Sequence, residues 1–207
     1  AFFARPTRHC AKLGLDQLTL FAFSTENWKR PRTEISFLMR LLRRYLIDER
    51  DELMDNDIRL VSIGRIAGLP RDVQRALART EQLTEHNKGM VLCLALNYGG
   101  RMELADAARR LANDTAAGVI DLGALDDEGL QRALGSRLYQ ADMPPLDLLI
   151  RTGGEQRLSN FLLWQMSYGE FHVADACWPD FREPHLDAAF DDYRSRVRRF
   201  GGLVKKR

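Results

Sequence analysis

The sequence alternates short, β-rich apolar runs with longer segments in which apolar residues recur every three or four positions. Alternation of this kind is typical of a mainly parallel sheet with helices on both faces. The strand candidates lie at residues 18–23, 58–63, 90–96 and 146–150. A chain of 207 residues can bury such a sheet without metal or disulfide support. We therefore predict a single α/β domain over residues 1–207.

The most regular helical segment begins after Pro31, where Thr33 is a candidate N-terminal cap. Its apolar residues form one stripe, which consists of Ile35, Leu38, Met39, Leu42 and Leu46. Packing of this stripe on the sheet is the simpler interpretation. The alternative is that part of it lines an apolar tunnel. Further helices are predicted at residues 70–85, 101–113, 126–134 and 185–200, with a loop at 116–123.

The composition excludes several classes of protein. A formal net charge of +2 is too small for a general polyanion binder, so no nucleic acid partner is expected. No run approaches the roughly 20 apolar residues of a membrane-spanning helix, and membrane contact is expected to be peripheral at most. The three cysteines, Cys10, Cys93 and Cys177, show neither a disulfide pattern nor a zinc pattern. They are interpreted as reduced thiols of a cytoplasmic protein.

The loop after the fourth strand candidate carries groups suited to phosphate. Arg151, Arg157, Ser159 and two glycines, Gly153 and Gly154, follow it within ten residues. Ligands bind beyond the carboxyl ends of strands in open parallel sheets. Guanidinium groups can grip phosphate oxygens, glycine amides can approach them, and a helix starting near Ser159 would point its positive end at the anion. The alternative is a solvated turn.

The loop after the first strand candidate is the second unusual segment. It combines hydroxyl, carboxamide, cationic and indole groups in Ser24, Asn27, Trp28 and Arg30. It could receive an anionic head group while the following helix accommodates an apolar tail. The alternative treats residues 24–27 as turn and capping residues and Trp28 as a core anchor.

The third segment of interest begins with a carboxylate, Glu170. Glu170 opens a strand-like stretch that is otherwise apolar, and a buried carboxylate must be paired, protonated or bound to a cation. Mg2+ is one candidate, because it favours one or two carboxylates together with phosphate oxygens. A structural Glu–Arg pair is the other.

Five sequence blocks resemble the signature blocks of bacterial undecaprenyl diphosphate synthases, in the order of that cis-prenyltransferase family. They read FAFSTENWKRP at 21–31, NYGGR at 97–101, DLLIRTGGEQRLSNFLLW at 147–164, WPDF at 178–181 and RRFGG at 198–202. The resemblance implies a dimeric α/β enzyme with a tunnel for its growing chain. Such an enzyme condenses an allylic diphosphate, typically farnesyl diphosphate, with successive isopentenyl diphosphates through cis double bonds, using Mg2+.

The same resemblance assigns roles to individual residues. It places Arg151, Arg157 and Ser159 on isopentenyl diphosphate and Glu170 on Mg2+. It also implies that Arg199, in the C-terminal motif, reaches the diphosphate site across a dimer interface. The residues implied around the reacting substrates are Phe23, Ser24, Asn27, Trp28 and Arg30.

One departure from the family pattern concerns the aspartate motif. Family members begin with a strand and an Asp-Gly-Asn-Gly-Arg-Trp motif that serves the metal and the allylic diphosphate, and no such motif occurs in these 207 residues. Two departures are milder: Gln156 stands where many family members have histidine, and Gly169 stands where alanine is frequent. Omitted residues, a truncated chain and a non-catalytic partner subunit of the same fold are the three explanations. A nucleotide-binding protein is disfavoured because no P-loop or G-x-G-x-x-G motif follows a strand.

Overall fold

The strands of the fold run parallel to their neighbours and form two small sheets. The computed structural model describes residues 4–198. Strands β1 (Gln17–Ser24), β3 (Val91–Tyr98) and β2 (Arg59–Ile63) pair in that order. Strands β4 (Leu148–Thr152) and β5 (Glu170–Ala174) pair with each other. The predicted α/β fold with parallel strands is confirmed, and the sheet is divided into two parts.

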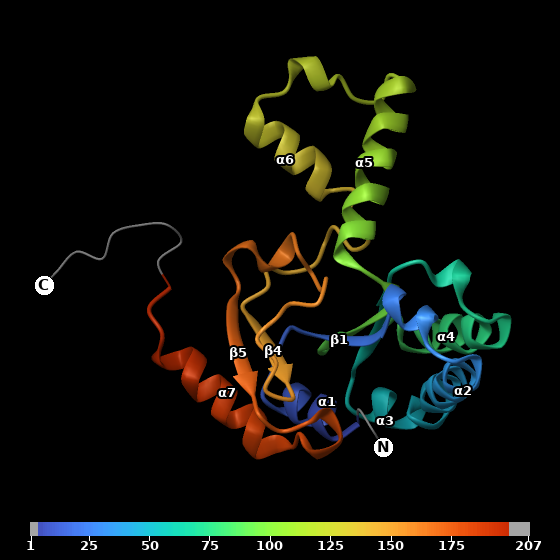
Figure 1. Cartoon of the computed structure of the whole chain (residues 1–207), viewed down its shortest axis with the longest axis vertical. Helices are drawn as coiled ribbons and strands as arrows, with labels where there is room; N and C mark the ends of the chain where they lie inside the picture. Colours follow the sequence, from blue (N-terminus) through green and yellow to red (C-terminus); the bar gives the residue numbers. More distant parts are fainter. Residues whose placement is uncertain (1–3, 199–207) are drawn as a thin grey trace, which may run out of the picture.

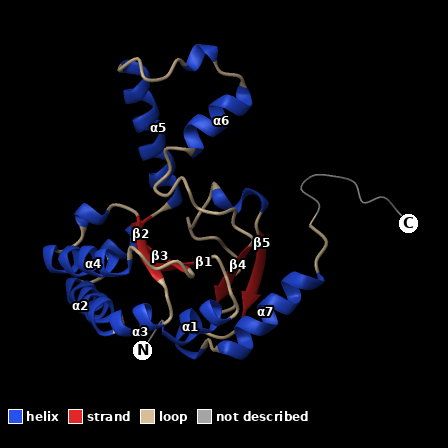
Figure 2. Cartoon of the chain, turned by 180° about the vertical axis from the view of Figure 1, so that it is seen from behind, coloured by secondary structure: helices blue, strands red, loops and turns tan. Residues whose placement is uncertain are grey.

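Helices flank both sheets (Figure 1). Helices α2, α3 and α4 gather beside the three-stranded sheet, and α1 and α7 lie near the two-stranded sheet. Helices α5 and α6 project together from the body of the molecule (Figure 2). The helix bounds are α1 (Ala4–Lys12), α2 (Arg32–Asp48), α3 (Arg50–Asp55), α4 (Arg71–Thr84), α5 (Gly100–Ala116), α6 (Asp127–Gly135) and α7 (Glu183–Ser195).

The central strand of the larger sheet shows why the apolar runs become strands. Residues 92–96 of β3 are each 0% exposed, because β3 has a neighbour on both edges and helices near it. Leu92 lies opposite Leu18 of β1 and Leu60 of β2. A parallel strand that is buried on both faces reads as a continuous apolar run, and β3 does so.

Helix α2 corrects one prediction and confirms another. Pro31 is the N-cap residue and Thr33 lies inside the first turn, so the predicted Thr33 cap is wrong. Proline is tolerated at this place because Pro31 precedes the helix, where its missing N–H costs no intrahelical hydrogen bond. Met39, Leu42 and Leu46 are buried in the main core. These three residues of the apolar stripe therefore pack in the core, as the simpler interpretation predicted.

A cavity of about 410 Å³ lies between the two sheets. Leu18 and Leu20 of β1 line it together with Leu148 and Ile150 of β4, and these two strands do not pair with each other. Helix α2 contributes no residue to its lining. A tunnel along α2 therefore stays a prediction.

The predicted last helix, over residues 185–200, has different bounds. Helix α7 begins at Glu183 and ends at Ser195, and the chain is extended at Arg196. No helix within residues 4–198 combines the length and the apolar composition needed to cross a membrane.

Candidate active site

The carboxyl ends of β1, β3 and β4 bring three distant loops together. The short 3-10 helix η1 (Thr25–Lys29) follows β1, the turn into α5 follows β3, and residues 153–169 follow β4. Asn160 of the last loop contacts Glu26 of η1 and the first residue of α5, Gly100. The two loops that the sequence singled out are thus neighbours at the edge where parallel sheets bind ligands.

The loop after β1 is ordered by its own polar residues. The backbone N–H of Ser24 donates to Oδ1 of Asn27 at 2.9 Å, so these two residues do form a turn, as the alternative interpretation expected. The indole Nε1 of Trp28 donates to Oδ1 of Asn97 at 2.7 Å, and the Trp28 ring meets Phe23 edge to face at 5.0 Å. Trp28 is still 37% exposed, and it is therefore not a core anchor.

Arg30 lies at the exposed end of the same loop. Its Nη1 donates to Oε1 of Glu34 at 2.7 Å, and both side chains are more than 40% exposed. An exposed i,i+4 pair of this kind contributes little to stability. The guanidinium of Arg30 can therefore leave Glu34 for an anionic ligand at small cost.

The two glycines after β4 form a turn and do not offer their amides to a ligand. Gly153 and Gly154 adopt φ values of 82° and 70°, which favour glycine. Their N–H groups donate to the carbonyls of Ala176 and Ala174 at 2.9 and 3.0 Å. The prediction that these amides approach a phosphate is wrong, because the last residue of β5 and the turn after it already accept their hydrogen bonds.

No helix begins near Ser159, so the predicted helix dipole at this site is also wrong. Ser159, Asn160 and Leu162 have φ values of 52°, 63° and 45°, in the left-handed region that cannot propagate a right-handed helix. The next helical turn is the four-residue η4 at Gln165–Tyr168. An anion bound at this loop would therefore gain no helix dipole from it.

The two arginines, Arg151 near the end of β4 and Arg157 in the loop after it, differ in their surroundings. Arg151 lines a second cavity of about 290 Å³ with Phe21, Leu158 and Trp178. Its Nε is buried and has no hydrogen-bond partner among the described residues. Arg157 is 65% exposed and pairs with Glu155. Because buried donors are almost always satisfied, the Nε of Arg151 is in greater need of an acceptor than the Arg157 guanidinium.

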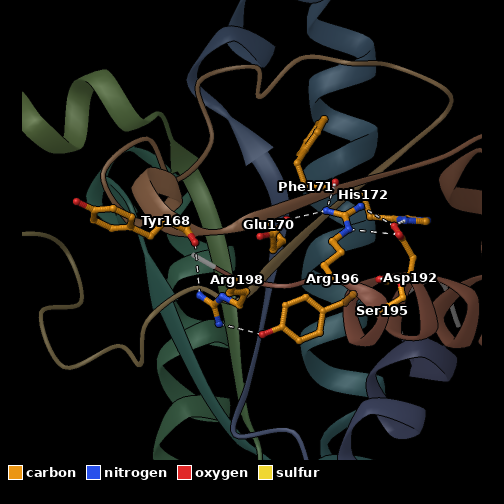
Figure 3. Close-up of polar contacts among 9 residues, drawn as sticks. Tyr168, Glu170, Phe171, His172, Asp192, Ser195, Arg196 and Arg198 are labelled. Carbon is orange, nitrogen blue, oxygen red and sulfur yellow. Dashed lines mark hydrogen bonds and ion pairs between the residues drawn. The ribbon is translucent and has the colours of Figure 1, made fainter. Parts of the chain in front are cut away.

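Glu170 lies at the opposite end of the small sheet and is paired with an arginine. It is aligned with Leu148, whereas Arg151 is aligned with Val173, three residues or about 10 Å further along the strand. Oε2 of Glu170 accepts from Nη1 of Arg196 at 2.9 Å (Figure 3). The structure therefore shows the Glu–Arg pair, and it does not bring Glu170 to Arg151.

Arg196 joins Glu170 to a further acid–base pair. Its Nη2 donates to Oδ2 of Asp192 at 2.6 Å, and Nδ1 of His172 lies 2.6 Å from the same oxygen (Figure 3). These bonds connect the end of α7 to the start of β5. Among residues 4–198 no group of three or more His, Cys, Asp or Glu residues could hold a metal ion. The carboxylates of this part of the chain thus do not form a metal centre on their own.

The C-terminal motif is only partly described. Arg198 pairs with Asp147, just before β4, and donates to the hydroxyl of Tyr193 at 2.9 Å. Arg199 lies outside the described residues, as do the phenylalanine and glycines that follow it. Its role across a dimer interface stays a prediction.

Two functional candidates were not predicted from the sequence. Asn97, with φ of 47°, holds Trp28 and donates to the carbonyl of Arg65 at 2.9 Å. Glu103 of α5 is 1% exposed and accepts from the hydroxyl of Tyr98 at 2.5 Å. Burial is the main cause that raises the pKa of Tyr98 far above its ordinary value, and the negative charge of the Glu103 carboxylate is the second. The available signal was their place in or next to the NYGGR block.

Sequence comparisons give one consistent family. The family described as "Putative undecaprenyl diphosphate synthase" matches residues 3–201. An isoprenyl transferase of Geobacter sulfurreducens is 46% identical over 192 residues, which cover 93% of this chain and 76% of the relative. A second relative is the ditrans,polycis-undecaprenyl-diphosphate synthase of Micrococcus luteus, named as (2E,6E)-farnesyl-diphosphate specific. It is 44% identical over 197 residues, which cover 95% of this chain and 78% of the relative.

Two solved structures share the fold. Lavandulyl diphosphate synthase from Lavandula x intermedia, solved in complex with dimethylallyl diphosphate, superposes with a TM-score of 0.91 at 36% identity, covering 96% of this chain and 84% of that one. A "probable undecaprenyl diphosphate synthase" from Campylobacter jejuni superposes with a TM-score of 0.81 at 34% identity, covering 97% and 90%.

Proposed function

The chain belongs to the undecaprenyl diphosphate synthase family, and we infer on this premise that it is a cis-prenyltransferase. It elongates an allylic diphosphate with successive isopentenyl diphosphates through cis double bonds. Farnesyl diphosphate is the proposed starter and undecaprenyl diphosphate the proposed product, in line with the name of the Micrococcus relative. The observation that carries the proposal is the buried Nε of Arg151, which has no hydrogen-bond partner in the described part of the chain and lies beside a cavity at the carboxyl end of β4.

The isopentenyl diphosphate is proposed to bind at the loop after β4. The Nε of Arg151 lacks an acceptor among residues 4–198, and Arg157 can exchange its partner Glu155 for a phosphate oxygen. The exposed Ser159 hydroxyl lies two residues further on and can donate a third hydrogen bond. Charge-assisted bonds from guanidinium groups are stronger than neutral ones, so the two arginines are expected to supply most of the affinity.

The allylic diphosphate is proposed to react beside η1. When the diphosphate group leaves the allylic carbon, negative charge develops on the diphosphate and cationic character on the carbon. Preorganised hydrogen-bond donors stabilise the negative charge. Arg30 is the proposed cation for the leaving diphosphate, because its pair with Glu34 is exposed, while Ser24 and Asn27 set the turn of the loop. The faces of Phe23 and Trp28 are suited to the carbon skeleton. Loss of a proton from the condensed product then completes the cycle.

The growing chain needs a dry space. Each added isoprene unit exposes more apolar surface to water unless the protein covers it, at roughly 25 cal/mol per Å². We expect a tunnel that includes the apolar face of α2. Its volume would then limit the length of the product.

Mg2+ is the proposed cofactor. Hard cations of this size take one or two carboxylates together with substrate phosphate oxygens, and the bound ion supplies charge neutralisation. Glu170 is the proposed carboxylate ligand. It is held by Arg196 in this structure, so binding of the ion through Oε2 requires that pair to open.

The proposed assembly is a homodimer in the cytoplasm. Arg199 would then complete the diphosphate site of the partner. Release of a long polyprenyl product is proposed to occur at a membrane surface, with peripheral contact only.

Substrate binding tests the proposal. Labelled isopentenyl diphosphate should bind the full-length protein, and Arg151→Ala should weaken that binding while Arg132→Ala, an exposed change on α6, should not. Equal affinity in parent and Arg151→Ala proteins would refute the site. The alternative, a non-catalytic subunit of the same fold, predicts no product from the purified protein alone and product only after a partner is added.

A further inference from the structure

Asn160 holds three segments that are far apart in sequence. Its carbonyl accepts from the N–H of Gly100 at 2.7 Å, and its Oδ1 accepts from the N–H of Arg101 at 2.8 Å. Its Nδ2 donates to Oε1 of Glu26 at 3.0 Å. One residue thus contacts the start of α5 and η1, while lying itself in the loop after β4.

The contact with α5 is a helix cap supplied from a distant loop. The first N–H groups of a helix have no partner within it, and Gly99, the N-cap residue, has no side chain to offer. Asn160 accepts from the first two of these groups, Gly100 and Arg101. The packing is close: a Cβ on Gly99 would lie 2.7 Å from Nδ2 of Asn160 and 2.9 Å from Oγ1 of Thr25. Glycine at 99 therefore allows the three segments to meet.

An asparagine suits this place because it both donates and accepts. The cap requires an acceptor, which aspartate also supplies, whereas the bond to the Glu26 carboxylate requires a donor, which ionised aspartate lacks. The backbone φ of 63° is also one that asparagine tolerates better than most residues.

We propose that Asn160 is a positioning residue that couples η1 to the loop carrying Arg157 and Ser159. Asn160 directly follows Ser159, and Glu26 is followed by Asn27 and Trp28. The Asn160–Glu26 hydrogen bond therefore fixes the distance between the two loops that receive the two diphosphates. This inference rests on the proposed function. A small displacement between reacting groups costs up to roughly a hundredfold in rate, so the bond should matter to turnover more than to folding.

An exchange of donor and acceptor tests the coupling. Asn160→Asp keeps the cap on α5 but places a carboxylate against Glu26. Glu26→Gln alone still accepts from Asn160 through its amide oxygen. In the double variant, the amide of the new glutamine donates to the new aspartate, and the bond returns with reversed roles. Asn113→Asp, the same change at an exposed position of α5, is the matched control.

The expected result is a specific rescue. Asn160→Asp should lower kcat/KM by roughly tenfold or more without lowering the melting temperature, because aspartate is as good a cap as asparagine. The double variant should return to within about threefold of the parent, a departure from additivity that only interacting residues show. Asn113→Asp and Glu26→Gln should stay close to the parent. A double variant no faster than Asn160→Asp would overturn the coupling.

Hydrogen exchange gives a second readout that needs no activity. Asn160→Asp should speed exchange at Thr25–Lys29, and the double variant should restore protection there. Unchanged exchange in Asn160→Asp would overturn the coupling even if activity falls. If the parent protein incorporates no isopentenyl diphosphate, the proposed function fails, and the exchange experiment still decides whether Asn160 joins the two loops.

Discussion

Trp28 and Asn97 are joined by a 2.7 Å hydrogen bond from the indole Nε1 to the side-chain Oδ1. The bond connects the loop after β1 to the carboxyl end of the neighbouring strand β3, where Asn97 is the second-to-last residue. It holds a half-exposed tryptophan in one orientation at the edge where the proposed substrates meet.

Trp28→Phe should therefore cost stability as well as activity. Phenylalanine can keep the contact with Phe23 but leaves Oδ1 of Asn97 without its donor. We expect the free energy of unfolding to fall by about 0.5–1.5 kcal/mol, as for one hydrogen bond. Urea unfolding measures it. In an Asn97→Ser background the same change should have a smaller effect, and an equal effect there would contradict the pairing.

Arg151→Ala and Arg157→Ala should weaken the use of isopentenyl diphosphate. Lost phosphate contacts are expected to reduce kcat/KM by the equivalent of about 1.5–3 kcal/mol each. Arg157 should lie at the lower end, because its side chain is 65% exposed. Kinetics at limiting isopentenyl diphosphate measure the loss, with Arg132→Ala as control. Parental kinetics in both correctly folded variants would show that the site is misplaced.

Asp106 should make stability depend on acid pH. The hydrogen bond from Arg65 comes first among the causes that lower the pKa of Asp106 from 3.8 to about 2, and partial burial opposes it. A lowered folded-state pKa stabilises the protein above pH 3.8, and this contribution disappears as the pH falls towards 2. Asp106→Asn should thus lower stability at pH 7 by ~2 kcal/mol at most, less any solvent screening.

The measurement compares urea unfolding of the parent and Asp106→Asn proteins at several pH values. Their difference should shrink as the pH falls from 4 towards 2. The control is Asp191→Asn, since Asp191 is 75% exposed in its pair with Arg194. A difference that is independent of pH would contradict the ionic role of Asp106.

Arg199 can be tested by subunit exchange. Arg199→Ala should reduce turnover strongly while leaving the fold nearly unchanged, whereas a solvated helix-end charge would contribute only about 0.3–1 kcal/mol. Mixed with Arg157→Ala, it should form heterodimers in which one site carries both defects and the other neither. Partial activity should then return. Subunit exchange is verified by mass spectrometry. If activity does not return after verified exchange, the result argues against a shared site.

The strands could be predicted because their signal is local. The apolar run of β3 follows from burial on both faces, and the edge strands β1 and β2 are partly buried. Each of the three lies within two residues of its predicted bounds. The division into two sheets could not be predicted in this way, because it depends on which strands meet in space. Apolar composition does not distinguish the edge of β1 that meets β3 from the edge that faces a cavity.

The candidate site was predicted in part for the same reason. Loop composition identified Arg151 and Trp28, which the structure places near the carboxyl ends of their strands. It suggested a helix at Ser159, although the backbone there is left-handed and is held by contacts with α5. It also gave no reason to select Asn160, whose partners lie about 60 and 134 residues away. The arginine partner of Glu170 could be identified only once Arg196 was seen beside it.

Product formation tests the central claim most directly. The full-length protein is incubated with farnesyl diphosphate, labelled isopentenyl diphosphate and Mg2+, and the extracted lipids are separated by chain length. We predict long polyprenyl diphosphates with cis double bonds, and a strong reduction in the Arg151→Ala variant. Incorporation no greater than in a control without enzyme would contradict the assignment as a cis-prenyltransferase.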